Sequence, residues 1–263
     1  MCKDDSPPRQ DRRPGRSGPP SRRRPNRPPS SRQNHPGHRP RRRHALDSWW
    51  IPRERDVPLL SPRIPAETLE RLWTMLAHEQ AALLNASHLA TSPMIGAQTV
   101  TRYIDLLVDL LLVRRLRPFH INVGKRLVRS PKVYVRDSGI VHALLGIGDY
   151  NALSGHPVVG ASWEGFAIEN LIAAAPVRTA PSFYRTAAGA EIDLVLEIPG
   201  HGRWAFDIKR SRSAKPEKGF HLAVQDLKPD RQFLVNSGSE RYPTTGGLEA
   251  IGLAEMAEEL GNL

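Results

Sequence analysis

Two aspartates and a lysine in the second half of the chain have the types and spacing of a phosphoester-hydrolysing site. Asp193 lies in the segment AEIDLVLEI, and Asp207 and Lys209 lie in RWAFDIKR with one residue between them. Paired carboxylates bind Mg²⁺, which lowers the pKa of a bound water and stabilises a leaving group. A lysine beside them could orient the attacking water or stabilise charge on the pentavalent phosphate.

The two segments that carry these residues alternate apolar and polar residues, as strands do. A PGHG break predicts that they form an antiparallel hairpin. Strict alternation places Ile192 and Leu194 on one face and Asp193 on the other. A pairing that keeps apolar residues opposite each other then brings Asp193 across from Asp207 or Lys209.

A third carboxylate comes from the predicted helix SWEGFAIENLIA. At about 100° per residue, Glu164 falls inside the arc of apolar side chains, whereas Glu169 lies outside it and is expected to be solvated. A buried carboxylate needs a metal, a lysine or a strong hydrogen bond. The predicted catalytic residues are Glu164, Asp193, Asp207 and Lys209, with Mg²⁺ held by Asp193 and Asp207. The alternative is an exposed ion pair on a sheet face, which would contribute little.

The elements around this set predict an α/β domain over residues 155–263. A helix, the strand PSFYRT, the hairpin, a second helix, the strand RQFLVN and a last helix follow one another. This order indicates one sheet with helices packed on it.

Residues 65–148 are expected to form a winged-helix-like domain. A helix that starts at a proline is followed by a short helix capped by Asn85 or Ser87 and by the longer helix in QTVTRYIDLLVDLL. Strands at 112–117 and 132–136 would form the hairpin of the wing.

If this domain contacts DNA, its longer helix would face the groove and the basic segments after it would reach phosphates. Asp105 and Asp109 on that helix would repel the DNA backbone. The alternative is a scaffold used only for packing between domains. The predicted nucleic-acid-binding residues are Gln98, Thr99, Arg102, Arg114, Arg115, Lys125 and Arg126.

The N-terminal segment has the composition of a disordered tail. Residues 1–44 contain thirteen Arg and one Lys against three Asp, so they carry the whole net charge of +11. We expect residues 1–45 to be disordered, because they have too few apolar side chains to offset the ordering entropy, and 46–64 to be a connector. The tail would bind phosphates, be inert, or result from translation of GC-rich DNA upstream of the true start.

The cysteine content and the apolar stretches indicate a soluble cytoplasmic protein. Cys2 is the only cysteine, so neither a disulfide framework nor a cysteine-based zinc site is expected. The longest apolar stretch, LLVDLLLV, is short and is interrupted by Asp109, which argues against a membrane span or a signal peptide.

Glu164, Asp193 and the Asp207-Ile208-Lys209 tripeptide resemble the PD-(D/E)xK pattern of restriction-endonuclease-like nucleases, although Ile192 replaces the proline of that signature. The segments LLVRRLRPFHINVGKRLVRSPKVYVRDSGIVHALLGI, WEGFAIENLI and YRTAAGAEIDLVLE are similar to the C-terminal half of prokaryotic AAA-superfamily ATPases of the DUF4143 family. The resemblance covers residues 52–263. It implies a restriction-endonuclease-like mixed sheet with flanking helices, preceded by a winged-helix segment.

In that family a P-loop ATPase precedes this region, but the sequence has no G-x-x-x-x-G-K-[ST] motif. The nearest match, around Gly124 and Lys125, has Phe119 in place of the first glycine and Arg126 in place of Ser or Thr, so no ATP-binding residues are expected. The resemblance implies the C-terminal fragment of such a protein, cleaving DNA with Mg²⁺. The alternatives are a non-catalytic DNA- or protein-interaction module, or an accessory subunit that works with an ATPase on a separate chain or as a homo-oligomer.

Overall fold

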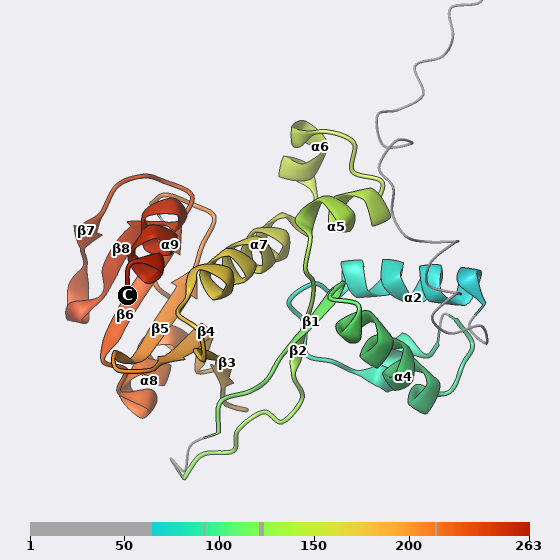
Figure 1. The fold of residues 1–263 in the computed structure, drawn as a ribbon, viewed down its shortest axis with the longest axis horizontal. Helices are drawn as coiled ribbons and strands as arrows, with labels where there is room; N and C mark the ends of the chain where they lie inside the picture. Colours follow the sequence, from blue (N-terminus) through green and yellow to red (C-terminus); the bar gives the residue numbers. More distant parts are fainter. Residues whose placement is uncertain (1–64, 92, 121–123, 214) are drawn as a thin grey trace, which may run out of the picture. The chain divides into compact units, whose positions relative to one another are not determined.

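The computed structural model describes residues 65–263, except residues 92, 121–123 and 214 (Figure 1). The predicted tail and connector lie outside the described residues. Within the described residues, no helix is long and apolar enough to cross a membrane.

The first half contains the elements that the sequence predicted, in the same order. They are α2 (Ala66–His78), α3 (Ala86–Leu89), α4 (Ala97–Asp109), β1 (Val113–Leu116) and β2 (Lys132–Val135). Two short helices, α5 (Ser138–Leu144) and α6 (Tyr150–Gly155), follow them. Asn85 caps α3, because its side chain accepts a hydrogen bond from the backbone N–H of His88 at 3.1 Å. The short helix α6 occupies part of the stretch that was expected to separate two domains.

The antiparallel pair β1–β2 lies between two hydrophobic cores. Val133 and Val135 of β2 pack with the helices of the first half. Tyr134 faces the other way and joins the core that α7 (Val159–Ala174) shares with the sheet of the second half. Lys132 follows the same alternation as Tyr134, so its ammonium is directed toward the second half.

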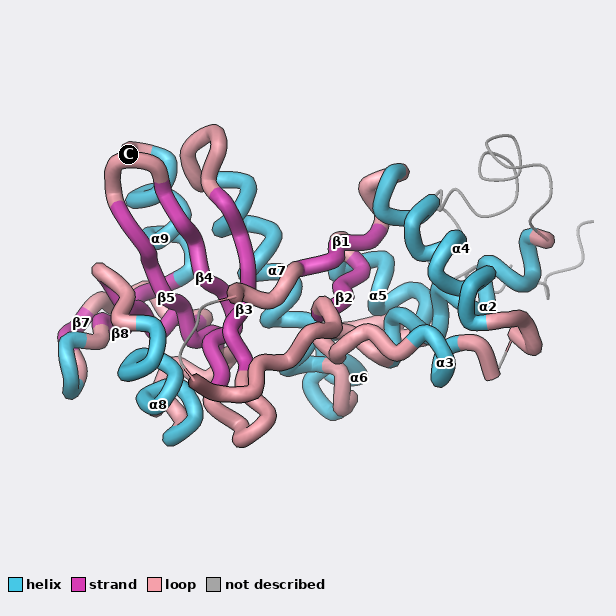
Figure 2. Tube along the Cα trace, turned by 90° about the horizontal axis from the view of Figure 1, so that it is seen from below, coloured by secondary structure: helices cyan, strands magenta, loops and turns pink. Residues whose placement is uncertain are grey.

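The second half is a six-stranded mixed sheet with flanking helices, as expected (Figure 2). Its strands lie in the order β3-β4-β5-β6-β8-β7, with β5, β6 and β8 parallel and the other neighbours antiparallel. The elements after α7 are β3 (Ala180–Arg185), β4 (Glu191–Ile198), β5 (Gly202–Ile208), α8 (Lys218–Leu227), β6 (Arg231–Asn236), β7 (Tyr242–Pro243), β8 (Glu249–Gly252) and α9 (Leu253–Gly261).

Helices cover both faces of this sheet. Leu171 of α7 and Met256 of α9 pack on one face, together with Leu194, Phe206 and other apolar strand residues. The helix α8 covers the opposite face, where its apolar side chains form a second layer with alternate residues of the strands. The sheet is therefore buried on both sides, and a charged side chain within it needs a partner.

The register of the β4–β5 hairpin is the first of the two that the sequence predicted. Leu194 pairs with Phe206 and Leu196 with Trp204, and the regular pairing ends at Leu194, directly after Asp193. The prediction that Ile192 and Leu194 share a face was wrong. Ile192 packs on the face covered by α8 and Leu194 on the opposite face.

A β-bulge explains this difference. Ser182 pairs with Val195 and Tyr184 pairs with Ile192, so β4 has one more residue than β3 between these two pairs. A bulge reverses the alternation and re-aims a side chain. Here the extra residue falls at Asp193 and Leu194, so Ile192 and Leu194 face opposite sides of the sheet.

Candidate active site

Asp193 lies at the centre of a buried ionic cluster. Its Oδ2 accepts a hydrogen bond from the backbone N–H of Ile208 at 2.9 Å, and its Oδ1 lies 3.6 Å from Lys132 Nζ. Lys132 connects it to Glu164 on α7, and Asp207 and Lys209 lie on its other side. The structure thus brings together the four predicted catalytic residues, Glu164, Asp193, Asp207 and Lys209.

Lys132 is a member of the cluster that the sequence analysis did not identify. Its side chain is only 3% exposed, and its Nζ lies 3.0 Å from Glu164 Oε1 and 2.8 Å from Glu191 Oε1. Tyr134 donates a hydrogen bond to Glu164 at 2.7 Å. The strand KVYV holds the signal that could have found both residues, because a period of two puts the lysine and the tyrosine on one face of an otherwise apolar strand.

The charges of this half of the cluster shift two pKa values upward. Burial and the nearby Asp193 raise the pKa of Glu164 to about 6, although Lys132 and Tyr134 oppose this shift. For Lys132, burial lowers the pKa, but the carboxylates around it outweigh burial and raise it. The ammonium therefore stays charged at neutral pH and serves as an internal counter-ion.

On the other side of the cluster, Asp207 is buried and incompletely paired. Lys209 Nζ lies 3.2 Å from Asp207 Oδ1 and 3.2 Å from Glu217 Oε1. The second oxygen of Asp207, Oδ2, is buried and has no hydrogen-bond partner within the described residues. Burial and then the charge of Asp193 raise the pKa of Asp207 to about 7, which outweighs the effect of Lys209.

The cluster as a whole carries more negative than positive charge. Four carboxylates that are at most 27% exposed (Glu164, Glu191, Asp193 and Asp207) share three cations (Lys132, Arg185 and Lys209), and Lys209 also contacts the exposed Glu217. A buried excess of this kind is relieved by protonation or by a bound cation.

The carboxylates of the cluster match a Mg²⁺ site that is completed by waters and substrate rather than one made of protein ligands alone. No group of three or more His, Cys, Asp or Glu side chains placed to hold an ion was found in the described part of the chain. Mg²⁺ is commonly held by one or two carboxylates, waters and substrate phosphates. Asp193 and Asp207, with the unpartnered Asp207 Oδ2, match that smaller requirement.

Glu169 is paired rather than solvated, so the prediction made for it was wrong. Its side chain is 14% exposed and binds the guanidinium groups of both Arg114 and Arg136. Arg114 forms two hydrogen bonds with it, and Arg136 Nε donates to Oε2 at 2.8 Å. The arginines come from β1 and from the residue after β2, so the pairing depends on where the hairpin lies against α7.

Several predicted nucleic-acid-binding residues have partners inside the protein. Arg114 binds Glu169, Arg115 binds Asp105, and Lys125 lies 2.6 Å from a carboxylate oxygen of Asp226. Of the remaining predicted residues, Gln98, Arg102 and Arg126 are exposed and Thr99 is half-buried.

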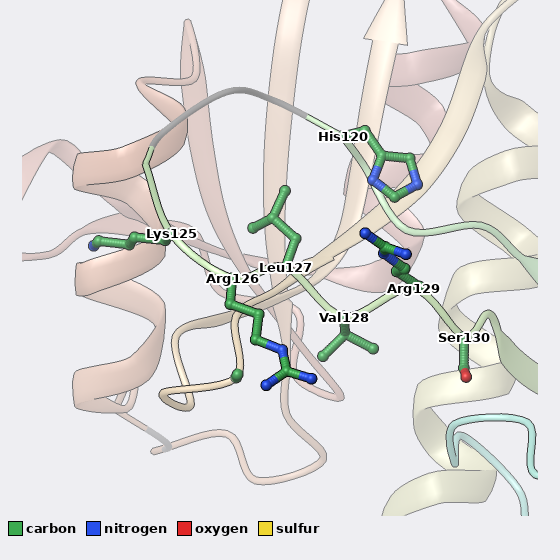
Figure 3. Close-up of a pocket in the computed structure, with 8 residues that line it drawn as sticks. His120, Lys125, Arg126, Leu127, Val128, Arg129 and Ser130 are labelled. Carbon is green, nitrogen blue, oxygen red and sulfur yellow. The ribbon is translucent and has the colours of Figure 1, made fainter.

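Two basic stretches between β1 and β2, one before residue 121 and one after residue 123, lie along β3, the edge strand of the sheet (Figure 3). Phe119 donates a backbone hydrogen bond to Phe183, and Val128 donates one to Arg185 at 3.0 Å. His120, Arg126 and Arg129 line a hollow there. Within the described residues, no ion pair or side-chain hydrogen bond is found for Arg126 or Arg129, and both side chains are exposed.

The second of these stretches ends close to the acidic cluster. Arg129 precedes Lys132 by three residues, so their Cα atoms are at most about 11 Å apart. The exposed guanidinium of Arg129 is thus available to a phosphate chain that passes the cluster.

Two family models match the chain, one in each half. A domain of unknown function, DUF8612, matches residues 53–151, and another, DUF4143, matches residues 159–256. The second match confirms the resemblance for the sheet domain. The first half, which the resemblance assigned to the same family, matches a separate model.

The relatives that the chain resembles are longer than the chain itself. It is 43% identical over 199 residues to an uncharacterized protein of Mycobacterium tuberculosis and to one of Mycobacterium bovis. Each alignment covers 75% of this chain and 44% of the relative, so the chain spans less than half the length of these curated relatives.

Among solved structures, the chain is weakly similar to a Thermococcus gammatolerans assembly of McrB AAA+ hexamers with bound McrC. The TM-score is 0.30 at 9% identity, over 76% of this chain and 77% of that chain. By the family models, residues 159–256 are similar to DUF4143 and residues 53–151 are similar to DUF8612.

Proposed function

We propose that the sheet domain of this chain is a Mg²⁺-dependent phosphodiesterase that cleaves DNA. The observation that carries the proposal is the buried, unpartnered Oδ2 of Asp207 beside Asp193, within a cluster that has an excess of negative charge. Asp193 and Asp207 would hold the Mg²⁺. When bound, the ion would lower the pKa of a water and stabilise the negative charge that develops on the phosphate.

The residues of the chain have separate tasks in this proposal. The backbone N–H of Ile208 and the ammonium of Lys132 hold the Asp193 carboxylate in place. Glu164 binds Lys132 and so acts as a positioning residue. The sequence predicted Glu164 as a catalytic residue, whereas here it would act only through Lys132.

Lys209 would stabilise negative charge on the phosphate rather than act as a base. Burial lowers its pKa, but Asp207, Asp193 and Glu217 outweigh burial and raise it, so the amine stays protonated at neutral pH. Two carboxylates, Asp207 and Glu217, fix its position at 3.2 Å each. A charged, fixed amine can orient a water or stabilise an oxyanion, but it cannot accept a proton.

Nicking of supercoiled plasmid DNA tests the proposal. The chain is expected to nick the plasmid in Mg²⁺ and not in EDTA, and Asp193→Asn or Asp207→Asn should reduce the rate by at least about a hundredfold. Glu197→Gln is the matched control, because Glu197 lies on the same strand as Asp193, is 47% exposed and pairs with Arg203, which is not part of the cluster. Equal nicking by Asp207→Asn would show that this site is not responsible.

A non-catalytic interaction module is the second candidate, and Lys132 favours it. Because Lys132 already neutralises part of the charge of Glu164, Glu191 and Asp193, the cluster could serve only to fix the β1–β2 hairpin against the sheet. In that case neither the wild type nor any variant nicks DNA.

The resemblance to AAA-superfamily ATPases adds a partner to the proposal. We propose that the site works with a P-loop ATPase, which the 263 residues do not contain and which a further segment or a separate chain would supply. ATP hydrolysis by this chain alone should therefore equal the buffer background. Turnover by the purified chain would contradict this proposal.

A further inference from the structure

A hollow of about 860 Å³ lies beside the candidate active site. It is lined by α5, by α6, by the N-terminal half of α7 and by the loop that follows β5. Figure 1 shows α5 and α6 beside the N-terminal end of α7. The site proposed above does not use this hollow.

One side of the hollow is aromatic. Trp163 and Phe166 of α7 lie with ring centroids 5.9 Å apart, and Phe166 is 42% exposed although it is a large apolar side chain. Tyr150 of α6 is 70% exposed. Exposed rings gathered around one hollow offer flat faces on which unpaired bases stack.

The other side of the hollow is cationic and held in place. Arg210 donates a hydrogen bond to the hydroxyl of Tyr150 at 3.2 Å, and its carbonyl accepts one from Ser237 at 2.6 Å. The carbonyl of Arg212 accepts a hydrogen bond from Tyr242 at 3.3 Å. Within the described residues, no carboxylate is paired with Arg210 or Arg212, so both guanidinium groups are available to an anion.

The hollow and the acidic cluster share two segments of chain. Arg210 directly follows Lys209, and Trp163 directly precedes Glu164. The Cα atoms of Asp207 and Arg210 are at most about 11 Å apart, because three residues separate them. A strand that passes the two aspartates therefore comes within reach of the hollow.

We propose that this hollow binds an unpaired nucleotide of a DNA single strand next to the phosphodiester that is cleaved. The base stacks on the rings of Trp163, Phe166 and Tyr150, and Arg210 and Arg212 contact the phosphates. The choice of a DNA strand as ligand rests on the proposed function. A paired nucleotide does not fit this role, because its base faces are covered by the stack.

Binding of a labelled oligodeoxythymidylate of about 16 nucleotides, measured by fluorescence anisotropy in EDTA, tests the inference. The chain should bind this strand more tightly than the same strand annealed to its complement. Phe166→Ala should weaken binding of the single strand at least about fivefold and leave the duplex unchanged. Phe166 is partly exposed, so its removal leaves the core intact.

A second variant tests the hollow itself. A Cβ at Gly160 would meet no atom within 4 Å, and Gly160 lines the hollow, so Gly160→Leu should place an aliphatic side chain in the hollow without adding a ring on which a base could stack. It should weaken binding as much as Phe166→Ala does. Val177→Ala is the control, because Val177 is 90% exposed and lies outside the hollow.

Wild-type affinity for the single strand in both variants would overturn the inference. So would displacement of the strand by thymidine monophosphate at equal nucleotide concentration, because the ligand would then be a free nucleotide. Binding that depends on both residues in a chain that never nicks DNA would support the hollow and refute the proposed function. Nicking with binding insensitive to both variants would refute the hollow alone.

Discussion

Replacement of Lys132 by methionine is expected to destabilise the protein strongly at neutral pH. Methionine keeps most of the volume of the lysine stem but removes the ammonium that lies 3.0 Å from Glu164 and 2.8 Å from Glu191. The carboxylates around it, including that of Asp193, then lack their counter-ion in a buried position. The perturbation is therefore electrostatic rather than steric.

The size of the effect follows from the burial of Lys132. Its side chain is 3% exposed, so water cannot replace the lost ammonium. Removal of one partner from a buried ion pair typically costs about 3–5 kcal/mol. For a folded unit of this size, each kcal/mol lowers the melting temperature by about 2–4 °C, so we expect a fall of roughly 6–20 °C.

The loss of stability in Lys132→Met should be greater at neutral than at acidic pH. Glu164 already has a raised pKa of about 6, and removal of Lys132 takes away the charge that opposes this shift. An acid with a raised pKa in the folded state is destabilising above that pKa and harmless below its ordinary value. The deficit of the variant should therefore be largest near pH 7 and should shrink toward about pH 5.

Thermal unfolding followed by circular dichroism at both pH values checks this prediction. Lys132→Met combined with Glu164→Gln should recover part of the lost stability, because the second change removes one of the carboxylates that lack a counter-ion. Arg71→Met is the control, since Arg71 pairs with Glu67 at the surface, where the two side chains are 55% and 76% exposed, and its loss should cost less than about 1 kcal/mol. A melting temperature equal to that of the control, or a deficit that is the same at both pH values, would refute the reasoning.

Three further predictions concern separate parts of the molecule. Asp207→Asn should be more stable than the wild type near pH 7 and about as stable near pH 4, because the pKa of Asp207 is raised to about 7 in the folded protein and its charged form is unfavourable there. Urea unfolding across this pH range measures the difference, and a difference that does not change with pH would contradict the prediction. Gly219→Ala should lower the free energy of unfolding by about 1–3 kcal/mol, because its Cβ would lie 2.6 Å from a backbone carbonyl of the turn before β4. Gly160→Ala should not lower it, because its Cβ would meet no atom within 4 Å. Equal melting temperatures of the two variants would contradict this prediction. Arg129→Ala should lower the slope of the logarithm of DNA affinity against the logarithm of salt concentration by about 1. Arg115→Ala should leave this slope unchanged, because an aspartate already binds the charge of Arg115. Anisotropy titrations at several salt concentrations measure both slopes, and an equal change in the two variants would contradict the prediction.

The paired aspartates could be predicted because the evidence for them is local. Alternation of apolar residues and a short Gly-Pro break predict the hairpin, and the requirement that apolar residues face each other limits its register to two possibilities. The structure pairs Leu194 with Phe206 accordingly. The mixed sheet followed in the same way from the order of helices and strands.

The rest of the cluster depended on contacts between segments far apart in the sequence. Lys132 is separated from Asp193 by more than a helix and a strand, and its role depends on the two cores between which the β1–β2 hairpin lies. Glu169 lies outside the apolar arc of its helix, yet Arg114 and Arg136 cover it from the same hairpin. No glycine or other local signal marks the bulge at Asp193, so the reversal of the strand faces could not be read from the alternation.

Binding of Mn²⁺, as a substitute for Mg²⁺, is the most direct test of the central claim that Asp193 and Asp207 hold a divalent cation. The loss of the free-ion electron paramagnetic resonance signal should be measured at about pH 8, above the Asp207 pKa of about 7. Mn²⁺ should fill a saturable site in the wild type and in Glu217→Gln, and this site should be lost in Asp207→Asn. Equal binding by the wild type and Asp207→Asn would contradict the claim.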